Sequence, residues 1–275
     1  MEQSRIHELE VLAARARLLA VDMVHTANSG HIGGSLSAMD LLTVLYFHTM
    51  RVDPAHPHDP DRDRFVLSKG HCTPALYPIL SLRGFFPQDE LQLFRSIEGH
   101  LSGHAEMRHV KGVDMSTGSL GQGVSAAAGM ALAAKYQGKD CRIYTLLGDG
   151  EIEEGQPWEA FMFAHQYKLD NLCVIIDNNN LQIDGKITDV MSPYPIPEKL
   201  RAFGFQVREI DGHDFEQMES GFDEARATKG VPFAIIMTTI KGKGVSFMED
   251  VAGWHGKAPD EEQTRQAVEE LGGEW

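Results

Sequence analysis

The feature that most constrains the fold is a series of short apolar runs that alternate with segments of helical spacing. Three of these runs are "IYTLL" (143–147), "LCVII" (172–176) and "FAIIM" (233–237). A strand with one face in water would alternate apolar and polar residues, whereas a continuous apolar run indicates a strand buried on both faces. We therefore predict an α/β fold of the doubly wound type, with a mainly parallel sheet covered by helices on both faces.

The remaining segments fit one such domain over residues 1–275. Helices are predicted over 5–27, from Ser37 (as a possible cap) onward, 74–82, 125–138, 155–169 and 214–228, and a last one within 258–273. Strands are also expected at "FVLSKGH" (65–71) and "FQVREIDG" (205–212). The domain thus begins with an amphipathic helix and ends in a helical tail.

Bulk properties exclude several classes of protein. The 25 basic and 40 acidic side chains give a net charge of −15, which argues against general binding to nucleic acid or to an anionic membrane. The three cysteines, Cys72, Cys141 and Cys173, have no metal-binding or disulfide spacing, which favours a reducing cytoplasm, and Cys173 is expected to be buried. No segment has the roughly 18 apolar residues of a membrane helix, nor the apolar core of a signal peptide.

The ends of two apolar runs carry side chains that suit a metal. Asp149 lies between two glycines in "GDGEIEEG" (148–155), and the next run ends in "DNNN", Asp177–Asn180. Glycines let a phosphate approach the backbone, but a lone carboxylate would repel that phosphate unless a divalent cation lay between them. One of the three asparagines could complete the metal site. Alternatively, Asp149 caps a helix and the asparagines form a turn.

Several ordered motifs resemble those of a known family. "GDGEIEEG…DNNNLQIDG" resembles the thiamin diphosphate signature, and four further segments resemble, in order, the first domain of transketolases: "ANSGHIGGSLSA", "LSKGHCTPALY", "GHAE" and "TGSLGQGVSAAAGMALAAK". The resemblance runs from about residue 15 to 255. It departs from the family pattern at "IKGKGVSFMED" (240–250), where a glycine-tyrosine-glycine type of sequence is common.

The resemblance implies a cofactor, a metal and the residues that hold them. The cofactor is thiamin diphosphate, bound with Mg²⁺, Ca²⁺ or Mn²⁺. Asp149 and Asn179 correspond to metal-binding side chains, and Leu181 to a ligand through its backbone carbonyl. The N–H of Gly150 would face the diphosphate, and further cofactor contacts correspond to His71, Gly118, Leu120, Ile183 and His255.

The resemblance also implies catalytic roles. His31 and His104 correspond to histidines that contact the sugar donor, and His71 and His255 to histidines beside the diphosphate. Glu154 corresponds to a glutamate that links two active sites, although the acids of "EIEEG" could simply begin a helix. Imidazoles suit proton movement among sugar hydroxyls and carbonyls at neutral pH.

Other polar residues are expected to face solvent. For Lys241 and Lys243, solvated loop positions are favoured over contact with phosphate. The same applies to the histidines outside the glycine-flanked turns, such as His7, His56, His58 and His213.

The resemblance ends with the first domain of the family. It implies the amino-terminal subunit of a split transketolase, which needs a carboxy-terminal partner carrying the pyrimidine-binding domain, in an α2β2 assembly. The reaction would move a two-carbon ketol unit from a ketose phosphate to an aldose phosphate, in the pentose phosphate pathway or in a specialised sugar pathway.

Three alternatives stay open at this point. The chain could serve a 2-oxoacid dehydrogenase first component or a deoxyxylulose-phosphate synthase, or it could be a non-catalytic scaffold that binds the cofactor. A nucleotide-binding dehydrogenase is disfavoured, because "LLGDG" lacks the GxGxxG spacing.

Overall fold

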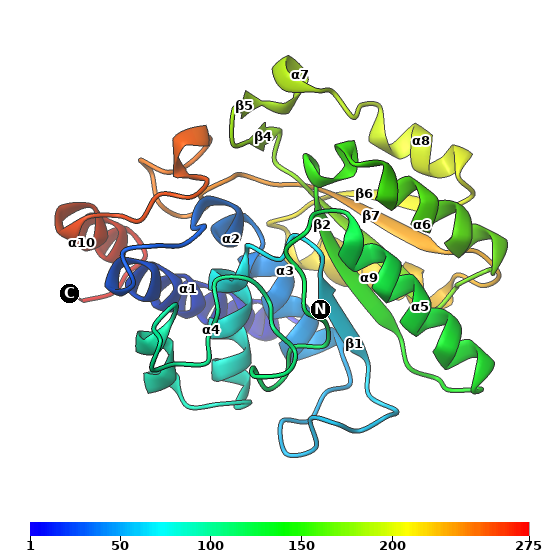
Figure 1. Ribbon diagram of the computed structural model, residues 1–275, viewed down its shortest axis with the longest axis horizontal. Coiled ribbons are helices and arrows are strands. Elements are labelled where there is room, and N and C mark those ends of the chain that lie inside the picture. Colours follow the sequence, from blue (N-terminus) through cyan, green and yellow to red (C-terminus); the bar gives the residue numbers. More distant parts are fainter. Residues whose placement is uncertain (275) are drawn as a thin grey trace.

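A five-stranded parallel sheet forms the centre of the computed structural model, which describes residues 1–274 (Figure 1). The strand order is β1-β2-β3-β7-β6, and every neighbouring pair is parallel. The strands are β1 (Arg64–Leu67), β2 (Ile143–Gly148), β3 (Leu172–Asn178), β6 (Gln206–Asp211) and β7 (Phe233–Thr238). The predicted parallel α/β sheet is confirmed.

Each central strand is buried on both faces. In β3, Cys173 and Ile175 belong to one hydrophobic cluster, while Val174 and Ile176 belong to the other. The first cluster is covered by α1 (Gln3–Thr26), α3 (Met39–Val44), α4 (Thr73–Arg83), α9 (Phe215–Ala227) and α10 (Glu261–Glu270). The second is covered by α5 (Gln122–Tyr136), α6 (Gly155–Gln166) and α8 (Ile196–Ala202). Two covered faces explain why the apolar runs do not alternate with polar residues.

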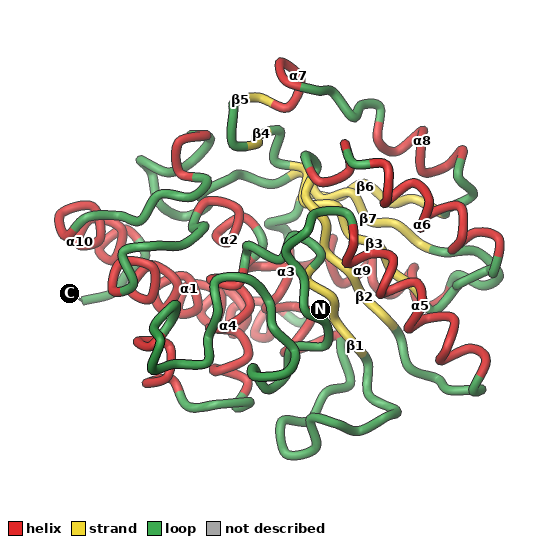
Figure 2. Tube along the Cα trace, viewed as in Figure 1, coloured by secondary structure: helices red, strands yellow, loops and turns green. Residues whose placement is uncertain are grey.

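The two helical layers are visible in Figure 1, with α1, α3 and α4 in blue and cyan on one side of the sheet and α5 and α6 in green on the other. Short elements occupy the connections: α2 (Gly33–Ser37), the π-turn Leu45–Thr49, α7 (Ile187–Val190), and 3₁₀ turns at Gln88–Leu93, Glu151–Glu153 and Ala252–Trp254. A two-stranded antiparallel hairpin, β4 (Leu181–Gln182) with β5 (Gly185–Lys186), extends beyond the sheet (Figure 2). The sequence pattern did not predict this hairpin.

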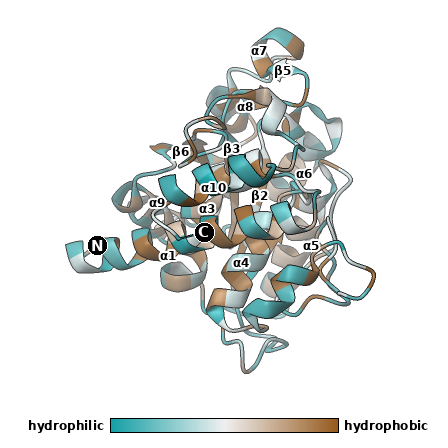
Figure 3. Ribbon diagram, turned by 90° about the vertical axis from the view of Figure 1, so that its left-hand side faces the viewer, coloured by the Kyte–Doolittle hydropathy of each residue, from teal (hydrophilic) through white to brown (hydrophobic). Residues whose placement is uncertain are grey.

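The predicted terminal helices are present as α1 and α10. α10 begins with a capping box, in which the Asp260 carboxylate accepts from the N–H of Gln263 and the Gln263 side chain accepts from the N–H of Asp260. Figure 3 shows α10 as mainly hydrophilic, and only Thr264, Ala267 and Val268 of this helix are buried. The helix therefore lies on the surface, against α1.

The predicted capping role of Ser37 is wrong. Ser37 lies inside α2, and α3 begins without a side-chain cap. The Ser37 hydroxyl donates instead to Asp177 Oδ2 at 2.7 Å and lies 3.1 Å from the Gly34 carbonyl. The Ser37 hydroxyl thus donates to a tertiary acceptor at the end of β3, whereas a capping serine would accept from a backbone N–H group of its own helix.

The prediction that His213 faces solvent is also wrong. Its Nε2 accepts from the N–H of Ile240 at 3.0 Å, so its Nδ1 carries the proton that is donated to Asp40 Oδ2 at 2.7 Å. Arg17 makes two further bonds to the Asp40 carboxylate, at 2.7 and 2.8 Å. Burial raises the pKa of Asp40, but Arg17 and His213 outweigh it and lower this pKa to about 2.

No helix within residues 1–274 is both long and apolar enough to cross a bilayer.

The buried Arg17–Asp40 pair provides a test of the fold. We predict that Asp40→Asn lowers the free energy of unfolding by about 3 kcal/mol, because it leaves the Arg17 charge uncompensated in the core. Asp40 stabilises the fold above its ordinary pKa of 3.8, and this stabilisation is lost as the pH falls toward 2. The difference in unfolding free energy between the wild type and Asp40→Asn should therefore become smaller below pH 3.8. Urea denaturation measures both effects. Glu8→Gln, which breaks an exposed pair with Arg5, should change the unfolding free energy by less than about 1 kcal/mol.

Candidate cofactor and metal site

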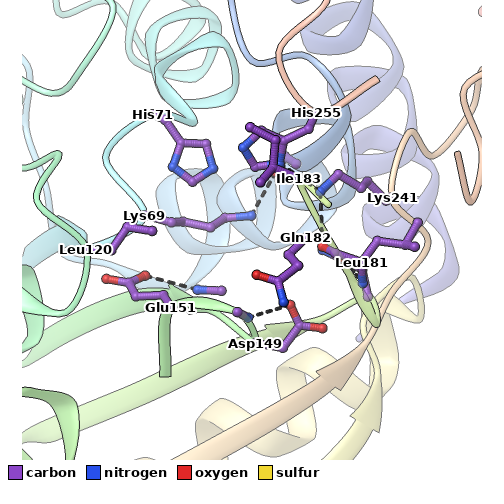
Figure 4. A pocket seen from close by; sticks show the side chains of 14 residues that line it. Lys69, His71, Leu120, Asp149, Glu151, Leu181, Gln182, Ile183, Lys241 and His255 are labelled. Carbon is purple, nitrogen blue, oxygen red and sulfur yellow. Dashed lines mark hydrogen bonds between the residues drawn. The ribbon is translucent and has the colours of Figure 1, made fainter. Parts of the chain in front are cut away.

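The carboxyl ends of four strands meet around one cavity of about 270 Å³ (Figure 4). Because the strands are parallel, the turns after β1, β2, β3 and β7 all lie at the same edge of the sheet. In the close-up, Lys69, His71, Lys241 and His255 lie along one side of the cavity, and Asp149 and Glu151 lie along the other. The cavity lining also includes Gly34, Leu120, Gly148, Gly150, Asn179, Leu181, Gln182 and Ile183.

Asp149 lies directly after β2 and joins the turns that follow β2 and β3. Its carboxylate accepts from the N–H of Gly150 at 2.9 Å and from the N–H of Asn180 at 2.6 Å. The side chain is buried, and burial together with the charge of Asp177 raises the pKa of Asp149 to about 7. The carboxylate caps no helix, so the structural alternative considered for it is wrong.

The three asparagines after β3 have different environments. Asn178 Oδ1 accepts from the hydroxyl of Tyr194 at 2.6 Å, which ties it to the loop before α8. Asn180 adopts a left-handed backbone conformation with φ of 59°. Asn179 is the one that lines the cavity, and its Nδ2 donates to Asp177 Oδ2 at 3.3 Å. The oxygen of its amide accepts from the N–H of Leu181 at 3.1 Å, so the amide orientation is defined at both ends.

Lys241 lies inside the site, and the prediction of a solvated loop lysine is wrong. The side chain is buried, and its Nζ lies 3.1 Å from the Leu181 carbonyl oxygen and 3.1 Å from His255 Nδ1. Burial and the nearby charge of Lys69 lower the pKa of Lys241. The loop Ile240–Val245 folds inward because the Gly242 N–H donates to the Gly33 carbonyl, at a φ of +81°. Lys243, in contrast, is partly exposed as expected.

A buried ion pair between Lys69 and Asp177 lies beneath the cavity. The Asp177 carboxylate also accepts from Ser37 and Thr239, which come from two other segments, and from Asn179, two residues further along the chain. Lys69 Nζ donates in addition to the Gly34 carbonyl at 2.8 Å. Burial raises the pKa of Asp177, but Lys69 and the hydroxyl donors outweigh it, so this pKa is lowered and the carboxylate stays ionised.

Glu151 is a buried carboxylate that joins three segments of the site. It accepts from the Ser68 hydroxyl, from the N–H of Gly121 at 2.9 Å and from the N–H of Gly148 at 3.1 Å. It therefore positions the "TGSLGQG" loop against the "GDG" turn. Sequence reasoning missed Glu151 and Lys69, although both lie within the quoted motifs, because nothing in a motif shows which charged residue is buried.

The four predicted histidines form one cluster. The ring centroid of His31 lies 5.0 Å from that of His71, 5.9 Å from His104 and 5.4 Å from His255, and the rings of His71 and His255 are 5.2 Å apart. His31 Nδ1 is buried without a hydrogen-bond partner among the described residues. Segments that lie far apart in the sequence thus contribute to one surface of imidazoles.

These histidines are held in their neutral forms. Burial lowers the pKa of His31 to about 4, and the nearby cations Arg95 and Lys241 add to this shift. Burial and the charge of Lys241 lower the pKa of His255 to about 3. The pKa values of His71 and His104 are also lowered, mainly by burial. Neutral imidazoles can both donate and accept hydrogen bonds at pH 7.

Of the other predicted residues, Leu120 and Ile183 line the cavity, whereas Gly118 and Glu154 do not. Leu120 and Ile183 are exposed apolar side chains, with 37% and 65% of their surface accessible, and they flank the cavity. Gly118 has a φ of +153°, and a Cβ at this position would lie 3.0 Å from the His104 ring. Glu154 is exposed at the N-cap position of α6 and makes no side-chain cap, so it belongs to the surface rather than to the cavity.

The residues of the cavity fit a diphosphate and a divalent metal. The Asp149 carboxylate, the Asn179 amide oxygen and the Leu181 carbonyl provide an all-oxygen donor set, which suits Mg²⁺, Ca²⁺ or Mn²⁺. Within residues 1–274, no three His, Cys, Asp or Glu side chains lie close enough together to form a metal site on their own. The donor set therefore suits a metal that takes its remaining ligands from phosphate and water, and a cation would favour the ionised form of Asp149.

The close contact of two loops at Gly70 can be tested directly. A Cβ on Gly70 would lie 2.5 to 2.7 Å from Thr117 and the N of Gly118. We predict that Gly70→Ala lowers the free energy of unfolding by about 1–3 kcal/mol, measured by urea denaturation. A Cβ on Gly129 of α5 would have no atom within 4 Å, so Gly129→Ala should leave stability unchanged or raise it by up to about 1 kcal/mol. Equal destabilisation by both variants would contradict this packing.

Comparisons with known proteins identify the relatives of this chain. A sequence profile described as "Transketolase, thiamine diphosphate binding domain" matches residues 9–275. The 6-deoxy-6-sulfo-D-fructose transketolase subunit SqwG of Clostridium sp. (strain MSTE9) is 45% identical over 264 residues, which cover 96% of each chain. An apulose-4-phosphate transketolase subunit of Phocaeicola vulgatus is 43% identical over 267 residues, covering 97% of this chain and 95% of that protein.

Comparison of the fold with solved structures also identifies transketolases. The crystal structure of transketolase from Campylobacter jejuni superposes with a TM-score of 0.91 at 36% identity, covering 97% of this chain and 43% of that one. With a matching family profile and relatives that align over almost their whole length, this chain belongs to the transketolase family of transferases, of which it carries the thiamin diphosphate-binding domain.

Proposed function

We propose that this chain is the amino-terminal subunit of a two-chain transketolase that moves a two-carbon ketol unit from a ketose phosphate to an aldose phosphate. The observation that supports this most strongly is the cavity where Asp149, Asn179 and Leu181 face a surface of neutral histidines. In this proposal residues 1–275 act as one cofactor-binding domain. The free, buried cysteines suit a cytoplasmic location.

In the proposed site, each group has a defined task. Asp149, Asn179 and the Leu181 carbonyl hold Mg²⁺ or a similar ion, and the Gly150 backbone approaches the diphosphate. The Lys241 ammonium, which already binds the Leu181 carbonyl oxygen, adds positive charge at the same place. Gly118, Leu120 and Ile183 contact the rings of the cofactor. When bound, thiamin diphosphate supplies the electron sink that C–C bond cleavage requires.

The histidines act on the sugar. His31 and His104 hydrogen-bond the oxygens of the donor, and His71 and His255 lie on the diphosphate side. Because their pKa values are lowered, each imidazole can donate from one nitrogen and accept at the other, and so move a proton between a hydroxyl and a carbonyl oxygen. Glu154, which is exposed, is proposed to act across the interface with another subunit.

The partner proposed for this chain is a carboxy-terminal subunit with a pyrimidine-binding domain, in an α2β2 assembly. Two relatives that align over nearly their whole length are named as transketolase subunits, which supports a two-chain enzyme. Their names give 6-deoxy-6-sulfo-D-fructose and apulose 4-phosphate as sugars. We therefore propose a sugar with an anionic tail as substrate, with pentose phosphates as one set among several.

A transfer assay tests the function. The chain is mixed with its carboxy-terminal partner, thiamin diphosphate and Mg²⁺, and labelled ketose is measured from xylulose 5-phosphate, 6-deoxy-6-sulfofructose or apulose 4-phosphate with an aldose phosphate. We predict ketol transfer from at least one donor. Asp149→Asn should lower kcat/KM by more than the roughly 10–100-fold typical of groups that only support a metal ligand.

Asp184→Asn is the matched control, because Asp184 is exposed in the β4–β5 connection and lies outside the cavity lining. It should retain full activity. Turnover of pyruvate without ketol transfer would instead indicate one of the other thiamin diphosphate enzymes and would contradict the proposal.

A further inference from the structure

A second pocket, of about 370 Å³, lies at the opposite edge of the sheet from the cofactor site. It is formed where β1 and β2 begin and where α9 leads into β7, with Arg142 directly before β2 and Lys229 after α9. Its volume is within the range of roughly 300–1,000 Å³ that is typical of small-molecule sites. None of its residues belongs to the site described above.

The lining of this pocket is basic, although the whole chain carries a net charge of −15. Four cations line it: Arg51, Arg142, Arg226 and Lys229. Two carboxylates, Asp63 and Asp140, also line it, so the cations are in excess. A positively charged pocket on a strongly acidic protein concentrates an anion locally.

Both carboxylates pair with the same cation, Arg51, and with none of the other three. Asp63 is buried, and it accepts from the backbone N–H groups of Arg51 and Arg142, at 2.9 and 2.8 Å, and from the Arg51 guanidinium at 3.3 Å. Asp140 is fully exposed, and its carboxylate makes only a long bond of 3.4 Å to Arg51. Within residues 1–274, neither the Arg142 guanidinium nor the Lys229 ammonium has a carboxylate oxygen within 4 Å.

The remaining guanidinium, that of Arg226, has a partner on its own helix. It pairs with Asp223, one turn earlier in α9, where 38% of the Arg226 side chain and 62% of the Asp223 side chain are exposed, and it also interacts with Tyr144 of the same pocket. Such exposed pairs contribute little and exchange readily. Arg226 is therefore able to turn toward an anion in the pocket.

Unsatisfied polar atoms lie in the same lining. The Thr49 hydroxyl and Arg142 Nε are buried without a hydrogen-bond partner among the described residues, and Thr49 is only 9% exposed. The Arg142 Nη2 donates to the carbonyls of Ala225 and Asp170, which hold the guanidinium in place. Buried polar groups without partners are costly, so a ligand that brings acceptors to this lining would be favoured.

From these observations we propose that this pocket binds the phosphate group of a small phosphate monoester. The dianion would accept hydrogen bonds from the guanidinium groups of Arg142 and Arg226 and from the Lys229 ammonium, with Arg51 at the rim. Guanidinium groups suit phosphate because they offer paired donors in one plane. The volume beyond a phosphate group leaves room for the rest of a small metabolite.

Isothermal titration calorimetry tests this site with two probes, inorganic phosphate and ribose 5-phosphate. The test variant is Arg226→Gln/Lys229→Gln, since Lys229 is exposed and Arg226 is partly exposed. We expect at least one probe to bind the wild-type chain, and the Kd to rise by about tenfold or more in this variant, as for the loss of charge-assisted hydrogen bonds. Binding of ribose 5-phosphate alone would identify an ester as the ligand, and binding of both with equal affinity would identify the phosphate group itself.

The control is Arg15→Gln/Arg265→Gln, which changes the net charge by the same amount at exposed positions on α1 and α10. It should bind both probes like the wild type. An unchanged Kd in Arg226→Gln/Lys229→Gln would mean that the anion binds elsewhere, including the cofactor cavity, and would overturn the proposal. Failure of both probes to bind the wild-type chain would overturn it as well.

Discussion

The buried ion pair between Lys69 and Asp177 is the interaction on which the rest of the site depends. Asp177 lies at the end of β3 and receives hydrogen bonds from Ser37, Thr239 and Asn179, while Lys69 reaches across to the carbonyl of Gly34. Removing one member of such a pair leaves a charge without compensation in a dry environment, which costs about 3–5 kcal/mol. One ion pair therefore fixes several chain segments relative to one another, and with them the amide of Asn179.

Above this pair, the cavity separates two kinds of chemistry. One side presents oxygens from Asp149, Asn179 and Leu181, which suit a cation, and the other side presents the neutral rings of His31, His71, His104 and His255. The two lysines on the histidine side, Lys69 and Lys241, add charge repulsion to the burial that keeps the nearby imidazoles unprotonated. The site thus combines a place for a metal-bound diphosphate with a surface that can exchange protons with a sugar.

The sheet and most of the cavity lining could be predicted from the sequence, because apolar runs and glycine-flanked motifs are local signals. Parallel strands bring their carboxyl ends together, so the motifs that follow them had to meet. Burial of individual polar groups could not be predicted in this way. Lys241 and His213 look like solvated loop residues in the sequence, yet both bond to tertiary partners, Leu181 and Asp40, and Lys241 is buried and His213 partly buried. Ser37 likewise bonds to Asp177, which is 140 residues away.

The central claim is that a metal held by Asp149 joins this chain to a diphosphate. The most direct measurement is a calorimetric titration of thiamin diphosphate into the chain together with its partner subunit, once with saturating Mg²⁺ and once with EDTA. The account predicts that binding requires the metal and is lost in Asp149→Ala. Equal affinity with and without metal, unchanged by Asp149→Ala, would contradict it.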